Sequence, residues 1–198
     1  MKRNEVRIVG GEWRSRRIRF PTRDDLRPTP DRVRETVFNW LGQDLAGLVC
    51  LDLFSGSGAL GFEAASRGAS RVVMVERDRV AHAALEENRA ALKASQVELV
   101  RGDALEFLRA DRAQYDVIFV DPPFTASCGE LLPKLLKSRL KPDGYAYYES
   151  ALGLEWPAEW QVLRRARAGN VVSQLVKRIA DEPHGRIPGD VRPDHAGS

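Results

Sequence analysis

The sequence predicts an α/β fold, a Rossmann-like doubly wound sheet of seven strands preceded by a small basic N-terminal β-hairpin. Apolar runs typical of strands alternate with helical stretches from residue 48 onward, which implies parallel strands joined by crossover helices. A glycine-rich loop at 56–61 follows the first of these strands, where parallel sheets bind ligands. The last two apolar runs have little helix between them, so we expect an antiparallel pair at one side of the sheet.

Residues 5–20 have the alternation expected of a β-hairpin. Val6 and Ile8 flank Arg7, and arginines alternate with apolar residues again at 17–20. Gly10 and Gly11 supply a permissive backbone for the bend between the strands. The hairpin would therefore have one apolar face and one basic face.

Trp13 stands inside the basic part of this hairpin, among Arg14, Arg16 and Arg17. Two interpretations stay open for its ring. It can stack on a base or a sugar, as aromatic residues in basic clusters do, or it can cover the apolar face of the hairpin.

A helix is expected after residue 29. Thr29 is a candidate N-cap, Pro30 would take the first helical position, and Asp31 would complement the positive end of the helix dipole. Three arginines near this start are expected to project within reach of a ligand or phosphate: Arg27, Arg32 and Arg34.

The remaining elements follow from the alternation of patterns. Strands are expected at 48–54, 71–76, 97–101, 116–121, 144–149, 160–165 and 171–178, and helices at 57–68, 78–94, 103–110 and 128–139. The predicted organisation is an N-terminal arm over 1–34, a main domain over 35–180, and a disordered tail over 181–198, where polar residues, prolines and glycines dominate.

Composition indicates a soluble globular protein. The chain has 198 residues, 43% of them hydrophobic and 30% charged. No apolar run approaches the roughly 20 residues of a membrane span, and the N-terminus has no apolar signal segment, so we expect a cytoplasmic protein. The two cysteines, Cys50 and Cys128, show neither a disulfide framework nor metal-ligand spacing, and we expect no metal site.

The charge is unevenly distributed along the chain. Residues 1–34 contain eleven Lys or Arg against five Asp or Glu, a net charge of +6, whereas the remainder carries 20 basic and 23 acidic residues, a net charge of −3. A basic arm on a mildly acidic body indicates a polyanionic partner that is met through the arm. A solvated, arginine-rich surface is the alternative.

Acidic residues are expected at the ends of four successive strands, namely Asp52, Glu76, Asp103 and Asp121. The glycines of the loop match G-x-G-x-x-G at Gly56, Gly58 and Gly61, a pattern that also occurs in dinucleotide-binding proteins. Asp52 argues against a dinucleotide, because its carboxylate would repel a pyrophosphate. It suits a cationic ligand such as the ammonium group of S-adenosylmethionine, with Glu76 placed for a ribose and Asp103 for an adenine amine. Asp103 is also an ordinary helix N-cap candidate.

Asp121-Pro122-Pro123-Phe124 follows a buried apolar run. The two prolines fix two φ angles and leave both backbone nitrogens without a proton, so the carbonyls nearby are left as acceptors. A carboxylate and a carbonyl beside an aromatic ring suit a flat molecule that carries an NH2 group. We therefore expect this stretch to hold an amine on an aromatic base.

With these motifs in view, the chain resembles the class I S-adenosylmethionine-dependent methyltransferases, and more narrowly the RsmD-type enzymes that methylate the exocyclic N2 amine of a guanine in small-subunit (16S) rRNA. The matching stretches are 7–14, 26–36, 52–63 and 120–124. The resemblance implies S-adenosylmethionine as cofactor and 16S rRNA or a small ribosomal subunit particle as partner, and it demands no state beyond a monomer.

The resemblance also assigns roles to residues. Those expected to bind the cofactor are Thr29, Arg32, Asp52, Phe54, Gly56, Gly58, Glu76, Arg77, Asp103 and Ala104. Those expected to be catalytic are Asp121, Pro122, Pro123 and Phe124, and those expected to contact RNA are Arg7, Trp13, Arg14, Arg16, Arg17 and Arg27.

Other functions remain open on the residues alone. An amino-methyltransferase acting on DNA or another RNA would use the same motifs, because an arginine-rich hairpin binds any polyanion. A non-catalytic RNA-binding assembly factor could retain the fold, although it would not need all four acids.

Overall fold

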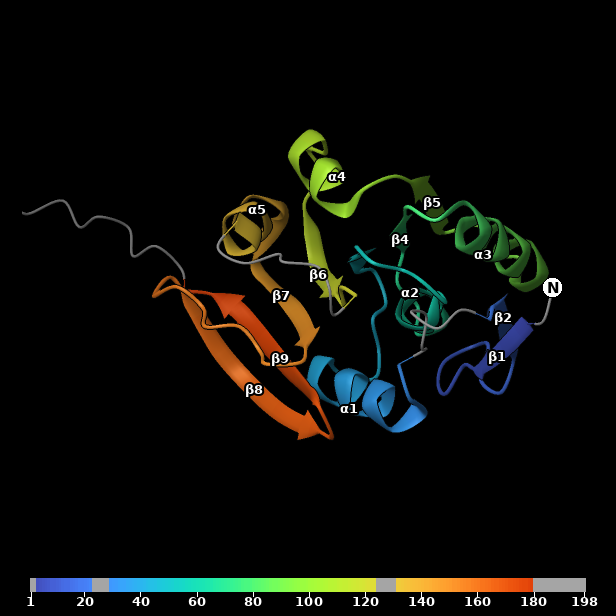
Figure 1. Ribbon diagram of the computed structural model, residues 1–198, viewed down its shortest axis with the longest axis horizontal. Helices are drawn as coiled ribbons and strands as arrows, with labels where there is room; N and C mark the ends of the chain where they lie inside the picture. Colours follow the sequence, from blue (N-terminus) through green and yellow to red (C-terminus); the bar gives the residue numbers. More distant parts are fainter. Residues whose placement is uncertain (1–2, 23–28, 124–130, 180–198) are drawn as a thin grey trace, which may run out of the picture.

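The structure is a computed structural model, and it describes residues 3–22, 29–123 and 131–179. Two strands, β1 (Arg3–Arg7) and β2 (Arg17–Pro21), form an antiparallel hairpin at one end of the molecule (Figure 1). They are joined by a loop over 8–16 that is longer than the bend expected at Gly10 and Gly11. The predicted tail, 181–198, lies outside the described residues.

The rest of the chain builds a sheet of seven strands with helices on both sides. The elements are α1 (Asp31–Leu41), β3 (Val49–Asp52), α2 (Ala59–Ser66), β4 (Arg71–Glu76), α3 (Arg79–Leu92), β5 (Val97–Arg101), α4 (Ala104–Ala110), β6 (Tyr115–Val120), α5 (Leu131–Arg139), β7 (Leu140–Ser150), β8 (Trp160–Ala168) and β9 (Val171–Arg178). The strand order is β5-β4-β3-β6-β7-β9-β8. The seven predicted strands are all present, and the predicted doubly wound fold is confirmed.

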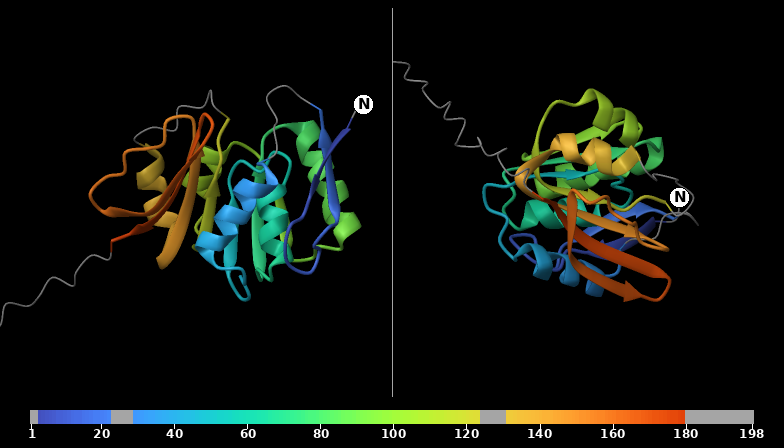
Figure 2. Two further views of the ribbon diagram at one scale, coloured as in Figure 1. Left: turned by 90° about the horizontal axis from the view of Figure 1, so that it is seen from below. Right: turned by 90° about the vertical axis from the view of Figure 1, so that its left-hand side faces the viewer.

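The C-terminal hairpin forms the edge of the sheet opposite β5. β9 runs antiparallel to both β7 and β8, which confirms the antiparallel pair expected at one side. In Figures 1 and 2 this hairpin and the N-terminal hairpin lie at opposite ends of the long axis.

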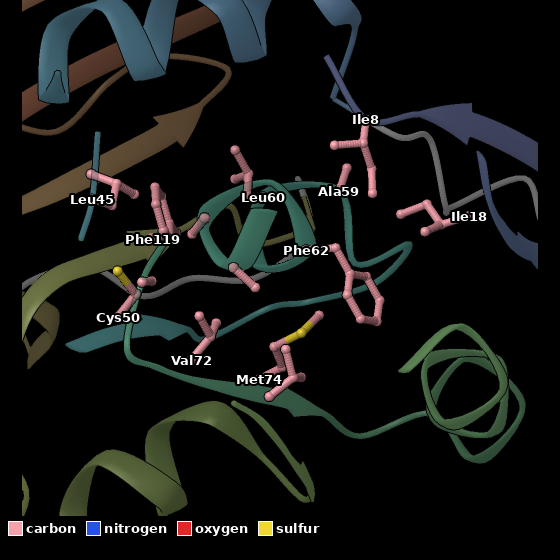
Figure 3. Packing of buried hydrophobic residues seen from close by; sticks show 14 of the residues in the cluster. Ile8, Ile18, Leu45, Cys50, Ala59, Leu60, Phe62, Val72, Met74 and Phe119 are labelled. Atoms are coloured by element: carbon pink, nitrogen blue, oxygen red, sulfur yellow. The ribbon is translucent and has the colours of Figure 1, made fainter. Parts of the chain in front are cut away.

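Two apolar cores cover the two faces of the sheet. One core joins the sheet to α1, α2 and α3, and it includes the apolar face of the N-terminal hairpin. Ile8 and Ile18 of that hairpin lie beside Ala59 and Phe62 of α2 (Figure 3). The second core joins the other face to α4 and α5. In the described part of the chain, no helix is long and apolar enough to cross a membrane.

Candidate active site

The four predicted acids lie at the carboxyl ends of the parallel strands, along one edge of the sheet. Asp52 ends β3, Glu76 ends β4, Asp103 lies two residues after β5, and Asp121 directly follows β6. Because β5, β4, β3 and β6 are neighbours in that order, the four acids stand on adjacent strands. Their positions at the strand ends are those predicted from the sequence. Their roles in cofactor binding and catalysis stay predictions.

The glycine-rich loop is tied to the acids on both sides of it. The Gly56 N–H donates to Glu76 Oε2 at 2.8 Å, and the Gly61 N–H donates to Asp52 Oδ2 at 3.0 Å. Gly58 stands at the start of α2 with a φ of 82°, and a Cβ there would lie 2.7 Å from Leu85 Cδ2. Glycine is therefore required at this turn, and two carboxylates determine where the loop lies.

Asp52 is a buried carboxylate, with 1% of its surface exposed. Burial raises its pKa to about 7, and the negative charge of Glu76 adds to the rise, while the Gly61 N–H opposes it. No cationic side chain among the described residues forms an ion pair with it. A cationic ligand at this position would restore the charged form of Asp52.

The other predicted cofactor residues differ in exposure. Asp103 caps α4, since its Oδ1 accepts from Leu105 N at 2.9 Å and Glu106 N at 3.1 Å, which leaves Oδ2 without a bond to a described residue. Among the rest, Ala104 is buried, Phe54 and Glu76 are half-buried, and Arg32 and Arg77 are exposed.

Thr29 does not act as the predicted N-cap of α1. The cap position is Pro30, which makes no side-chain cap bond. The Thr29 hydroxyl instead donates to Asp121 Oδ2 at 3.2 Å, a contact between residues 92 positions apart. The Thr29 side chain therefore contacts the predicted catalytic stretch instead of capping the helix.

Asp121 is half-buried beside a second acid. Burial raises its pKa well above the usual range, the charge of Glu149 raises it further, and the Thr29 hydroxyl lowers it. Pro122 is buried and Pro123 half-buried. Phe124, the fourth residue of the predicted catalytic stretch, lies outside the described residues.

Glu149 extends the row of acids to a fifth strand, β7, and it was missed in the sequence. It is 6% exposed, and its Oε2 accepts from the Tyr147 hydroxyl at 2.5 Å. The Tyr147 oxygen lies 3.1 Å from Ser173 Oγ on β9. The register pairs Val120 with Tyr148, so Asp121 and Glu149 follow paired residues on neighbouring strands. The rule that found the other four acids would have found this one, since the predicted strand ended at 149.

The N-terminal hairpin carries most of the predicted RNA contacts on its exposed side. Arg7 pairs with Asp31 at 3.1 Å, and Arg17 pairs with Glu5 at 3.0 Å. Arg16 donates to the Ala91 carbonyl at 2.7 Å, and Arg14 is exposed. Arg27 lies outside the described residues.

Trp13 differs from these arginines. Its side chain is 5% exposed and belongs to the core between the hairpin and α2, and its backbone N–H donates to Ser66 Oγ at 2.9 Å. The burial favours the structural interpretation over stacking on a base, because a buried ring has no free face. Gly11 allows the hairpin loop to approach the end of α2 closely. Its φ is 74°, and a Cβ added at this position would lie 1.9 Å from the Ser66 carbonyl oxygen.

Arg34 does not project toward a ligand as the sequence predicted. It is fully buried, and its guanidinium donates to Glu63 at 2.9 Å, to the Arg7 carbonyl at 2.6 Å and to Asp31 at 2.5 Å. Glu63 is fully buried as well and also pairs with Arg67 at 2.9 Å. The partner of Arg34 lies 29 positions away, so no local pattern could reveal the pair.

Glu63 also fixes the hairpin to the body of the protein. Its two carboxylate oxygens accept from the Val9 N–H at 2.9 Å and the Gly10 N–H at 2.7 Å. The carboxylate thus joins α1, α2 and the hairpin loop at one point.

Comparison with known proteins identifies the relatives of this chain. Residues 6–177 match the family described as "Conserved hypothetical protein 95". The chain is 41% identical over 181 residues to the Escherichia coli protein named "Ribosomal RNA small subunit methyltransferase D", covering 89% of this chain and 91% of the relative. The Haemophilus influenzae protein of the same name is 40% identical over 181 residues, covering 87% and 94%.

The solved structure of Escherichia coli yhhF superposes with a TM-score of 0.82 at 40% identity, covering 90% of this chain and 100% of that one. The resemblance predicted from the motifs is confirmed. The chain belongs to the conserved hypothetical protein 95 family, the RsmD-type methyltransferases.

Proposed function

We propose that this chain is an S-adenosylmethionine-dependent enzyme that methylates the exocyclic N2 amine of a guanine in 16S rRNA. The observation that carries the proposal is the position of Asp121 and Pro122 beside Asp52, at the carboxyl edge of adjacent strands. The residues favour an amine on a flat ring, and the names of the relatives favour small-subunit rRNA. We take the guanine from the family resemblance.

The residues at this edge fit the proposed cofactor. Asp52 is a buried acid that lacks an ion-pair partner in the described part of the chain, so it suits an ammonium group. Glu76 and Asp103 provide oxygen acceptors for a ribose and an adenine amine. The same acids would repel a pyrophosphate. When bound, S-adenosylmethionine supplies an electrophilic methyl group on a sulfonium.

The catalytic stretch would act on the amine of the base. This amine is a poor nucleophile, because its lone pair is delocalised into the ring. The Asp121 carboxylate and the Pro122 carbonyl would accept its two protons as hydrogen bonds, which favours a pyramidal nitrogen with its lone pair aimed at the methyl group. The Thr29 hydroxyl holds one Asp121 oxygen in place. Rate enhancement would come from positioning and electrostatics, and the amine would lose a proton after transfer.

Access to the amine requires that the base leave its stack. Bases inside structured RNA are reached after unstacking or flipping. Phe124 would stack on the flipped base and fix its plane. The exposed arginines of the hairpin would hold the surrounding backbone. A cytoplasmic location follows from this substrate.

The variant Asp121→Ala tests the proposal. It removes the acceptor for the amine, so methyl transfer should be lost while the affinity for S-adenosylmethionine, measured by calorimetric titration, stays nearly intact. Asp121→Asn is the matched control. Its carbonyl oxygen still accepts a hydrogen bond, so it should retain far more activity than the alanine variant. Equal losses of binding and transfer in Asp121→Ala would overturn the assigned role.

The substrate is tested with labelled S-adenosylmethionine and three acceptors: free 16S rRNA, assembled small subunits and DNA. The proposal expects label on rRNA, free or assembled, at guanine N2. Label on DNA would identify an amino-methyltransferase of another substrate class. Absence of label on all three, with intact cofactor binding, would contradict an enzymatic role.

A further inference from the structure

A hollow at the C-terminal hairpin lies on the same edge of the sheet as the catalytic stretch. It has a volume of about 360 Å³ and is lined by Ala151, Leu152, Arg165, Ala166, Arg167 and Val172. None of these residues belongs to the predicted cofactor or RNA sites. The volume falls within the range of small-ligand pockets, about 300 to 1,000 Å³.

The strand register places this hollow relative to Asp121. Val120 pairs with Tyr148, so Asp121 lies level with Glu149, and Glu149 pairs with Ser173, which pairs with Ala166. Three strand spacings of about 4.8 Å separate Asp121 from Ala166, or about 14 Å across the sheet. The spacing corresponds to roughly two or three nucleotides of extended chain, so a strand whose base enters the catalytic edge can reach the hollow.

The charge of this region favours an anionic partner. Residues 164–173, which form the end of the hairpin that carries the hollow, contain three arginines and no Asp or Glu. Arg165 and Arg167 are exposed, and neither forms an ion pair within the described ranges. The overall negative balance of residues 35–198 conceals this local positive charge.

An apolar side chain stands beside the two guanidiniums. Leu152 is 87% exposed, a large apolar surface left to solvent. A Cβ added to Gly153 would lie 3.5 Å from Arg165 Nη2, so that guanidinium lies against the loop over 151–154. Positive charge beside an exposed apolar surface matches a nucleotide, which combines a phosphate with a flat apolar base.

The loop that carries Leu152 is anchored. Gln174, 1% exposed, accepts from the Leu154 N–H at 2.7 Å and donates to the Leu154 carbonyl at 3.0 Å. The Gly153 N–H donates to Ser150 Oγ at 2.9 Å. The exposed Leu152 side chain is thus presented by a loop with a defined backbone, which is the arrangement of a preformed contact site.

We propose that this hollow binds a nucleotide of the RNA strand next to the target base, with Arg165 and Arg167 on its phosphates and Leu152 against its base or sugar. The proposal rests on the proposed function of the catalytic edge. The N-terminal hairpin and the C-terminal hairpin lie at opposite ends of the molecule (Figure 1), so the RNA would be held on both sides of the catalytic edge. Holding the strand on both sides would stabilise an unstacked target base between them.

The variant Arg165→Ala/Arg167→Ala tests the phosphate contacts in the full chain. With small-subunit rRNA or assembled subunits as ligand, Kd and KM should rise roughly tenfold or more at physiological salt, whereas kcat at saturating RNA changes little. The slope of log Kd against log salt should fall by about 1.4, which is two single-strand phosphate contacts at about 0.7 each. Affinity for S-adenosylmethionine should stay unchanged.

Two single variants separate the hollow from general surface charge. Arg164→Ala removes an exposed arginine next to Arg165 that does not line the hollow. Its effect on log Kd should be less than half of the effect per charge in the Arg165→Ala/Arg167→Ala variant. Leu152→Ala should weaken RNA binding several-fold with no change in the salt slope, because no charge is lost. Its high exposure makes a folding defect easy to exclude by thermal unfolding.

Distinct results overturn the two proposals. If wild-type protein methylates rRNA and Arg165→Ala/Arg167→Ala binds RNA with the wild-type Kd and salt slope, the nucleotide site is refuted while the proposed function stands. If Arg164→Ala changes log Kd for RNA as much per charge as the double variant does, binding depends on general surface charge. The nucleotide site is then refuted as well. If wild-type protein methylates no RNA, the proposed function fails first.

Discussion

Replacing Asp52 by asparagine should change how stability depends on pH. The folded protein binds the Asp52 proton more tightly than the unfolded chain, because burial raises its pKa from 3.8 to about 7. Stability without cofactor is therefore highest below pH 4 for this group and falls as pH rises toward 7. An asparagine side chain has no proton to lose, so this loss should be absent from the Asp52→Asn variant.

The magnitude follows from the size of the shift. A rise of about three pKa units corresponds to about 4 kcal/mol of stability lost once the pH exceeds 7, at 1.36 kcal/mol per unit. About a third of this loss has already occurred at pH 5. Between pH 5 and pH 8, wild-type protein should therefore lose about 3 kcal/mol relative to the variant.

Urea unfolding at several pH values between 5 and 8, without cofactor, measures this difference. Placing an amide near the loop N–H groups can cost stability, but that cost is the same at every pH. It therefore does not affect the change in the free energy of unfolding between pH 5 and pH 8. Affinity for S-adenosylmethionine should rise over the same range in wild-type protein and not in the variant, because the ammonium group needs a charged partner. Parallel stability curves for the two proteins would refute a buried, proton-binding Asp52.

Three further changes have defined outcomes. Glu63→Gln removes the buried charge that Arg34 and Arg67 share and should cost about 3 to 5 kcal/mol in thermal unfolding, whereas the surface control Glu98→Gln should cost under about 1 kcal/mol. Equal losses in the two variants would contradict a stabilising role of this buried carboxylate. Trp13→Ala should destabilise the protein by about 3 to 5 kcal/mol, and an unchanged Tm with weakened RNA binding would support stacking instead. Glu149→Gln removes the charge that raises the Asp121 pKa, so the rise of kcat/KM with pH should move to lower pH, and an unmoved profile would exclude that coupling.

The strands of the sheet could be predicted because each one corresponds to an apolar run of consecutive residues. β4, β5 and β9 begin and end where the apolar runs do. The acids at the strand ends could be predicted for a related reason, since parallel strands carry their carboxyl ends to one edge. The doubly wound topology, in which the strand order reverses at β3, then brings Asp121 at the end of β6 beside Asp52 at the end of β3.

Contacts between distant residues could not be predicted. Arg34 was predicted to project toward a ligand or phosphate and Thr29 to cap the helix, and both predictions were wrong because a remote partner competes for each side chain. Glu63 removes Arg34 from solvent, and Asp121 takes the Thr29 hydroxyl from the helix. A buried ion pair or a long-range hydrogen bond leaves no periodicity in the sequence.

The attachment of the N-terminal hairpin has a consequence for protein engineering. Helix α2 starts at the glycine-rich loop and ends where Glu63 and Ser66 hold the hairpin, so eight residues, about 12 Å of helix, separate the two. The hairpin is therefore not a detachable module. A graft onto another methyltransferase would need to carry α2 with it, and an insertion in α2, whose residues are all buried, would disturb the attachment of both the glycine-rich loop and the hairpin.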